Sequence, residues 1–242
     1  MVSPAPDAAV ARAALRSCPL FADLDDATLS LVADAMRARR YGRGEVIFHL
    51  DDPGDALYVV TSGEVKIVLP SDEGAEPVIL TTIAPGGFFG ELALLDGGPR
   101  SASAIAIRAV ETLVLRRDVF DRIVDGDPGL RRAMFGALAA EIRRLTGQVE
   151  DLHFLDLPGR LARQLLRTAG ASDDAIRSGD VQSETVRLAW PYTQSELAGM
   201  IGGSRQSVNR LLADFVQQGL LLFDGDELVI PEPSRLARAV GR

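Results

Sequence analysis

A glycine-rich stretch at residues 86–103 places the tightest constraint on what this chain can fold into. It reads GGFFGELALLDGGPRSAS. Gly86, Gly87 and Gly90 let the backbone approach a ligand closely, and the segment from Gly90 can open a short helix whose free N–H groups attract an anion. After a turn, Arg100 offers a planar fork of donors for phosphate oxygens. The stretch therefore predicts a binding site for a phosphate-bearing ligand.

Two more residues of this stretch narrow the class of ligand. Glu91 is expected to accept hydrogen bonds from sugar hydroxyls, and Ser101 adds a hydroxyl next to Arg100. An acidic residue that binds a ribose and a basic residue that binds a phosphate together suit a nucleotide. The alternative is a turn between strands that binds nothing, because Gly-rich turns are often only structural.

The composition excludes several classes of protein. The chain has 242 residues, 47% of them hydrophobic, which fits one large domain or two small ones. No apolar run reaches the roughly 20 residues that span a bilayer, and the N-terminus has no signal pattern. We therefore expect a cytoplasmic protein with no membrane partner.

The cysteine and histidine content argues against a metal centre. Cys18 is the single cysteine, so it cannot form an internal disulfide or supply the thiolates of an iron–sulfur cluster. The two histidines, His49 and His153, have no ligand partner at a useful spacing. We expect no metal, no iron–sulfur cluster and no haem.

The net charge of −8 argues against a uniformly basic surface. Residues 159–242 hold ten Arg and ten acidic residues, so this part is neutral and the excess of acid lies before it. A neutral C-terminal part can still bind DNA through a locally basic helix.

Short β-rich runs separated by Gly, Pro and Asp turns occupy residues 42–116. They predict strands at 46–50, 57–60, 65–69, 78–83, 103–107 and 112–115. Together these strands predict a jelly-roll-like β barrel. Before the barrel we expect a mobile, Ala-rich start and then a helix that opens at residues 24–29, with acids in its first turn.

A helical pattern from residue 128 to about 155 carries an apolar heptad seam. The seam residues are spaced alternately three and four apart. They are Phe135, Leu138, Ile142, Leu145, Val149 and Leu152. This period favours pairing with a second copy in a parallel homodimer; the alternative is a helix packed on its own barrel.

The C-terminal part begins with a new helix, which Asp156 is placed to cap with Pro158 in its first turn. A polar loop at residues 170–183 is expected to be mobile. Residues 193–212 then predict a helix, a glycine turn and a second helix, with a capping box formed by Thr193 and Glu196 and with Ser204 as the second cap.

The second of these helices has the pattern of a recognition helix. Its apolar residues recur at helical spacing from Val208 onward and are expected to face the core. Arg and Gln side chains, which pair with base edges in the major groove, fall on the opposite face. The expected DNA contacts are Thr193, Ser204, Arg205, Gln206, Ser207, Asn209 and Arg210. Residues 220–230 predict a β-hairpin, or wing.

The GELAL and RSA motifs resemble the phosphate-binding cassette of cyclic-nucleotide-binding domains. The full order of parts, with the FLDLPGR and SRQSVNR segments, resembles the cyclic-AMP receptor protein and fumarate–nitrate regulator family of bacterial transcription regulators. The resemblance implies an α+β fold with a cyclic-nucleotide-binding jelly roll at 1–127, a dimerisation helix at 128–155 and a winged helix-turn-helix at 156–242. It also implies a homodimer on a palindromic site in double-stranded DNA. RNA polymerase is a candidate partner and activation the expected role, with repression as the open alternative.

The same resemblance carries cyclic AMP over as the effector and assigns its contacts. These are Leu80, Gly90, Glu91, Leu92, Arg100, Ser101, Leu145 and Thr146. Two departures stand out. The family's best-known member places two adjacent hydroxyl residues of the dimer helix against adenine, one from each subunit, where this chain has Leu145 and Thr146. The same member has Glu where this chain has Gln206.

Several alternatives remain open from the sequence. One is a regulator of the same fold that is active without a ligand or responds to a cyclic dinucleotide, and cyclic GMP is not separated from cyclic AMP. A regulatory subunit of an enzyme is disfavoured by the helix-turn-helix. An enzyme using Glu91 and Arg100 is disfavoured because no triad, metal set or acid/base pair accompanies them.

Overall fold

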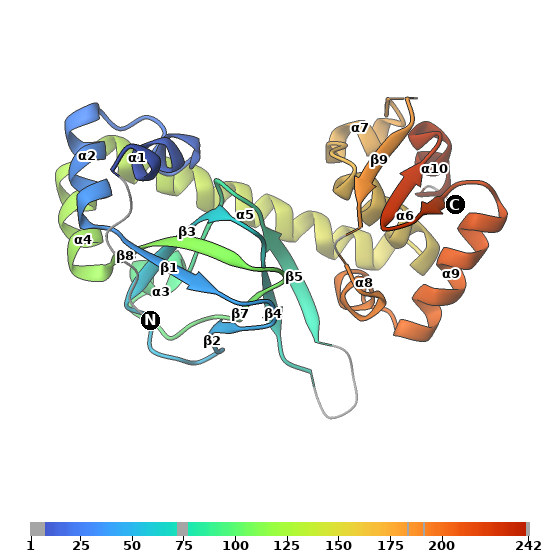
Figure 1. The fold of residues 1–242 in the computed structure, drawn as a ribbon, viewed down its shortest axis with the longest axis horizontal. Helices are drawn as coiled ribbons and strands as arrows, with labels where there is room; N and C mark the ends of the chain where they lie inside the picture. Colours follow the sequence, from blue (N-terminus) through green and yellow to red (C-terminus); the bar gives the residue numbers. More distant parts are fainter. Residues whose placement is uncertain (1–7, 72–76, 183, 191, 241–242) are drawn as a thin grey trace. The chain divides into compact units, whose positions relative to one another are not determined.

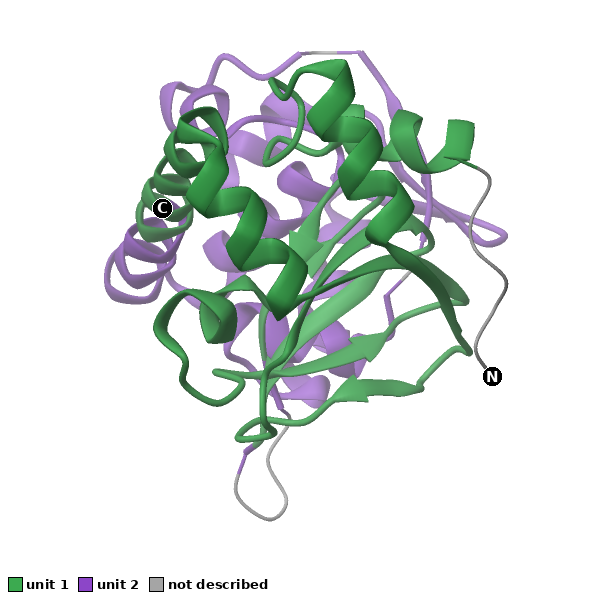
Figure 2. Ribbon diagram, turned by 90° about the vertical axis from the view of Figure 1, so that its left-hand side faces the viewer, with its two compact units in different colours: residues 1–70, 79–143 green, residues 71–78, 144–242 purple. Residues whose placement is uncertain are grey.

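The computed structural model describes residues 8–71, 77–182, 184–190 and 192–240 (Figure 1). The chain divides into two compact units, residues 1–70 with 79–143 and residues 71–78 with 144–242 (Figure 2). No described helix is long and apolar enough to cross a membrane.

The first unit begins with two helices, α1 (Ala8–Ser17) and α2 (Asp26–Ala35). Helix α1 corrects the expectation of a mobile start, of which residues 1–7 lie outside the described part of the chain. Alanine is the strongest helix former, and Ala11 and Leu15, four residues apart on one face of α1, are fully buried. The predicted helix is confirmed as α2, and Asp25 caps it by accepting a 2.9 Å hydrogen bond from the Thr28 amide.

All six strands predicted for the barrel are present, and the described part of this unit holds two more that were not predicted. The strands are β1 (Arg37–Tyr41), β2 (Val46–Phe48), β3 (Ala56–Ser62), β4 (Val65–Leu69), β5 (Val78–Ile83), β6 (Phe88–Phe89), β7 (Ser103–Ala106) and β8 (Val110–Arg116). They form two four-stranded sheets, in the orders β1-β8-β3-β6 and β2-β7-β4-β5. The unpredicted strands β1 and β6 lie at the two edges of the first sheet.

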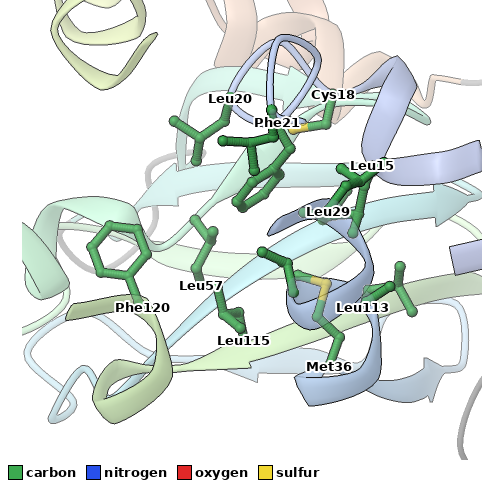
Figure 3. Packing of buried hydrophobic residues seen from close by; sticks show 14 of the residues in the cluster. Leu15, Cys18, Leu20, Phe21, Leu29, Met36, Leu57, Leu113, Leu115 and Phe120 are labelled. Atoms are coloured by element: carbon green, nitrogen blue, oxygen red, sulfur yellow. The ribbon is translucent and has the colours of Figure 1, made fainter. Parts of the chain in front are cut away.

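The first sheet separates two apolar clusters because side chains alternate along its strands. From β3, Leu57 and Val59 join the cluster built with α1, α2 and helix α4 (Arg117–Gly126), seen in Figure 3. Tyr58 and its neighbours on the other face join a second cluster, which draws side chains from both sheets and forms the barrel interior.

Cys18 belongs to the first of these clusters. Burial raises the pKa of its thiol to about 11, and backbone hydrogen bonds only partly offset that effect. The thiol therefore stays protonated near neutral pH and fills space in the core.

Helix α5 (Pro128–Phe154) matches the predicted run to within one residue and contributes to both compact units. Its apolar seam is largely uncovered in the single chain. Phe135 is 72% exposed and Ile142 is 64% exposed; Leu145, Val149 and Leu152 are exposed as well, and Leu138 is half-buried.

The second unit contains the predicted helices and wing. Its elements are α6 (Leu157–Thr168), α7 (Asp173–Ser178), β9 (Val186–Ala189), α8 (Gln194–Ile201), α9 (Arg205–Gln217), β10 (Leu222–Asp224), β11 (Glu227–Ile230) and α10 (Pro233–Val240). Asp156 caps α6 by accepting from the Gly159 amide, as predicted. The wing is a three-stranded sheet, β10-β11-β9, because the unpredicted β9 pairs with β11.

The loop expected at residues 170–183 contains helix α7, which corrects that expectation for its described part. Ser172 caps α7, and Ile176 is buried. An ion-pair network ties α7 and α6 to the end of α5. Asp151 pairs with the buried Arg163 and, at 3.1 Å, with Arg167, whose Nε lies 2.6 Å from Asp173.

Candidate ligand site and nucleic-acid interface

The candidate phosphate-binding cassette, residues 86–103, contains a sharp change of backbone direction at Gly90. Strand β6 ends at Phe89, Gly90 adopts a left-handed φ of 85°, and helix α3 (Glu91–Asp96) begins at the next residue. A Cβ atom at position 90 would lie 2.6 Å from Nη1 of Arg100 and 3.2 Å from the carbonyl oxygen of Ala56. Glycine is therefore required here both by conformation and by space.

Arg100 is anchored at both its backbone and its side chain. Its amide donates to the Asp52 carbonyl and its carbonyl accepts from the Asp51 amide, both at 2.9 Å. Nη1 donates to the Gly90 carbonyl at 2.7 Å, and Nη2 donates to the Ala56 carbonyl at 2.9 Å. The residue is only 3% exposed.

The remaining donor edge of Arg100 suits an anion. Its Nε is buried and has no hydrogen-bond partner in the part of the chain that the structure describes. A buried donor without a partner is unfavourable, and a guanidinium binds phosphate oxygens through pairs of N–H groups. Burial also lowers the pKa of Arg100, since the charged form is desolvated. An oxyanion at this edge would satisfy the free donor and stabilise the charge.

Glu91 heads helix α3 and is half-buried. Desolvation raises its pKa, and the carboxylate of Glu141 on α5 adds to that rise, whereas the charge of Arg100 opposes it. The structure thus brings Gly90, Glu91 and Arg100 together, as the sequence predicted. A carboxylate in this position can accept hydrogen bonds from hydroxyl groups.

The other predicted ligand contacts are more scattered. Leu80 is half-buried on β5, Leu92 is exposed on α3 and Ser101 is exposed directly after Arg100. Leu145 and Thr146 are both exposed on α5 and belong to the second compact unit. Their contact with a base remains a prediction.

The sequence reasoning missed three residues that hold Arg100. Ala56 accepts from the guanidinium, and the rings of Phe48 and Tyr58 lie 4.3 and 5.6 Å from its central carbon. Tyr58 lies in the predicted strand 57–60 and Ala56 directly before it, but no local signal connected either residue with Arg100.

The helix-turn-helix has the predicted caps. The Thr193 amide donates to Glu196 at 2.8 Å and the Glu196 amide donates to the Thr193 hydroxyl at 3.2 Å, which completes the capping box. Gly202 ends α8 in a left-handed conformation, with φ of 66°. Ser204 caps α9 by accepting from the Ser207 amide at 3.1 Å.

Helix α9 separates apolar from polar side chains as predicted. Val208, Leu211, Leu212 and Phe215 are buried. The opposite face exposes Arg205, Gln206, Asn209 and Arg210; Thr193 and Ser204 are exposed, and Ser207 is half-buried. Side chains of these types can donate to and accept from base edges.

Comparisons with known proteins match this architecture. Residues 38–127 match the model of the cyclic nucleotide-binding domain, and residues 159–239 match the Crp-like helix-turn-helix domain. A CRP-like cAMP-activated global transcriptional regulator of Mycobacterium tuberculosis is 33% identical over 219 residues, which cover 90% of this chain and 95% of the relative. The chain belongs to the CRP/FNR family of transcription regulators.

A further relative and two solved structures extend the comparison. The cyclic AMP receptor protein of Thermus thermophilus is 30% identical over 86% of this chain and 89% of the relative. FixK2 from Bradyrhizobium japonicum has a TM-score of 0.71 at 23% identity, over 84% of this chain and 96% of that structure, and shares the fold. So does the c-di-GMP responsive regulator CLP of Xanthomonas campestris, with a TM-score of 0.69 at 24% identity, over 85% of this chain and 99% of that structure.

Family membership confirms the α+β fold with a cyclic-nucleotide-binding domain and a helix-turn-helix. The protein is a DNA-binding transcription regulator and not an enzyme. Within the described ranges, no group of three or more His, Cys, Asp or Glu side chains is arranged to hold a metal ion.

Proposed function

We propose that the protein is a homodimeric transcription regulator switched by cyclic AMP. The observation that carries this proposal is the buried Arg100, whose Nε has no hydrogen-bond partner among the described residues. It lies beside Gly90, where there is no room for a side chain. Two relatives support the choice of nucleotide. One, at 33% identity, is named as cAMP-activated, and the other, at 30% identity, is named as a cyclic AMP receptor protein.

In the proposed complex each group of the ligand has its own partner. Arg100 and Ser101 take the cyclic phosphate, Glu91 accepts from the ribose hydroxyl, and Leu80 and Leu92 supply apolar contact. Thr146 accepts a hydrogen bond from the adenine amino group, with Leu145 beside it. Because only one of this last pair carries a hydroxyl, we expect weaker discrimination between bases at this end than two hydroxyls would give.

The switch is a change in population between two states of the dimer. Cyclic AMP that binds one arrangement of the recognition helices better than others raises the population of that arrangement. The boundaries proposed for the sensor, the dimerisation helix and the DNA-binding domain are 1–127, 128–155 and 156–242. The DNA site is palindromic, and the bound dimer acts as an activator that contacts RNA polymerase.

Calorimetric titration of the purified protein tests the effector. We expect cyclic AMP to bind and to raise the affinity for a palindromic operator in a gel-shift assay. Cyclic GMP and a cyclic dinucleotide serve as comparison ligands. DNA binding that is the same with and without cyclic AMP would instead favour a regulator that needs no ligand, and tighter binding of the cyclic dinucleotide would replace cyclic AMP as the effector.

Gln206 is expected to read a base that differs from the one read by Glu-bearing relatives. Its amide both donates and accepts and so suits adenine, whereas a glutamate can only accept from cytosine. Gln206→Glu should therefore move the preference at one operator position toward a G·C pair, with each wrong pair costing about 1–3 kcal/mol. Selection of sites from random DNA measures the change.

A matched control uses the same helix. Gln217 is exposed at the far end of α9, so Gln217→Glu makes the same change of charge away from the predicted base contacts. It should leave the selected sequence unaltered. Identical consensus sequences from the parent and Gln206→Glu would show that Gln206 reads no base.

A further inference from the structure

The ring of Phe48 lies directly against the guanidinium of Arg100. The central carbon of the guanidinium is 4.3 Å from the centroid of the Phe48 ring and 5.6 Å from that of Tyr58. A cation over the face of an aromatic ring is attracted by the ring's quadrupole, most strongly where water is excluded. Arg100 is almost fully buried, so this contact is made away from solvent.

The Phe48 ring is itself held in place by two others. Its centroid lies 5.7 Å from that of Tyr58 and 5.8 Å from that of Phe89, and Tyr58 and Phe89 stack at 5.0 Å with their planes 10° apart. Phe48 comes from β2 in one sheet, whereas the other two come from β3 and β6 in the other sheet. The three rings form an aromatic platform whose position is fixed by both sheets.

The platform and the carbonyl contacts restrain different motions of Arg100. The hydrogen bonds to the Gly90 and Ala56 carbonyls fix how the guanidinium is turned in its own plane. The ring face fixes the tilt of that plane. Two of the donor nitrogens are thereby engaged, and the Nε edge keeps its direction before any ligand arrives. Binding then loses less side-chain freedom than it would with a mobile arginine.

We propose that Phe48 is a positioning residue for the phosphate of the ligand and that it acts through Arg100. A leucine at position 48 would keep apolar volume but remove the ring face, and the guanidinium would lose its tilt restraint. The proposal rests on the proposed function only in that the ligand carries a phosphate. The orientation of Arg100 itself is a property of the protein without ligand.

The first test therefore uses the full chain without ligand. The guanidinium of Arg100 lies near the Phe48 ring face, so the NMR resonance of its Nε–H should carry a ring-current shift. Arg100→Lys, which removes the resonance, assigns it. Phe48→Leu should reduce the shift to the smaller part that the Tyr58 ring contributes, and Phe48→Tyr, which keeps the ring, should preserve it. If Phe48→Leu proves unstable, Phe48→Met provides a second variant without a ring that still fills the space.

The second test measures affinity for cyclic AMP by calorimetry. Phe48→Leu should bind about 3- to 30-fold more weakly than the parent, and Phe48→Tyr should bind like the parent. An unshifted affinity in Phe48→Leu would overturn the positioning role, as would an Nε–H resonance that does not move. A parent that binds no cyclic nucleotide overturns the proposed effector alone. The spectrum then decides, and a shift that is reduced in Phe48→Leu but kept in Phe48→Tyr still supports the inference.

Discussion

Replacing Arg100 with leucine should lower the affinity for cyclic AMP at least about a hundredfold. Arg100 is buried, and its Nε edge has no hydrogen-bond partner within the described ranges of the chain. Removing it takes away a charged, bidentate partner of the phosphate in a site shielded from water. Calorimetric titration of parent and variant gives the ratio of dissociation constants.

Arg100→Leu also leaves the carbonyls of Gly90 and Ala56 without their donors, so a structural effect has to be separated from a lost ligand contact. Arg117 provides the control, because it is half-buried and donates to the carbonyls of Gly54, Ala93 and Leu94 at 2.6–3.0 Å. Arg117→Leu should lower the melting temperature yet weaken binding far less. Equal loss of affinity in the two variants, or none in Arg100→Leu, would contradict the assignment of Arg100 to the phosphate.

The helix caps could be predicted because each depends on residues three apart in the sequence. Asp156 and Ser204 accept from the amide three residues later, and Thr193 exchanges hydrogen bonds with Glu196. Such contacts form whenever the helix forms, whatever surrounds it. The positions where α6, α8 and α9 begin were therefore read correctly from local pattern alone.

The elements that the sequence did not reveal depend on partners far away in the chain. Strand β1 reads RARRY, without the apolar alternation of a strand, yet it pairs with β8 along its whole length, and Arg40 lies 2.7 Å from Glu111. Pairing with a neighbour overrides intrinsic preference in such a strand. Helix α7 similarly depends on the burial of Ile176. That burial could not be predicted from the polar sequence around it.

The residues around Arg100 also divide into those whose proximity follows from local spacing and those brought together by distant parts of the chain. Gly90, Glu91 and Arg100 follow one another within a short motif, so their proximity was predictable from spacing. Phe48 and Tyr58 reach Arg100 only because both sheets meet in the barrel interior. Contacts of this kind depend on strand pairing and register, which the separate strand patterns leave undetermined.

Aspartate at both Ile142 and Val149 should convert the protein into monomers. These residues are exposed on α5 in the single chain, within a seam that continues from Phe135 to Leu152. A continuous apolar stripe of this kind is stabilised by burial against a partner, and its heptad spacing fits a second copy of the same helix. Two aspartates per chain would place four like charges in the seam and remove the apolar contacts there. Sedimentation velocity measures the result.

The control for this pair of substitutions lies on the same helix. Ala140 and Gly147 are offset by two residues from the seam residues Ile142 and Val149, on the side of the helix away from the seam. A Cβ at Gly147 would have no atom of the described residues within 4 Å. Ala140→Asp with Gly147→Asp adds the same charge and should remain dimeric. Operator affinity should depend on the oligomeric state of each variant. A dimer contacts two half-sites about 34 Å apart, whereas a monomer loses the roughly 10²- to 10⁴-fold gain in affinity from linked binding. If the variant with aspartate at Ile142 and Val149 stays dimeric and binds the palindrome as tightly as the parent does, the dimer contact lies elsewhere on the chain.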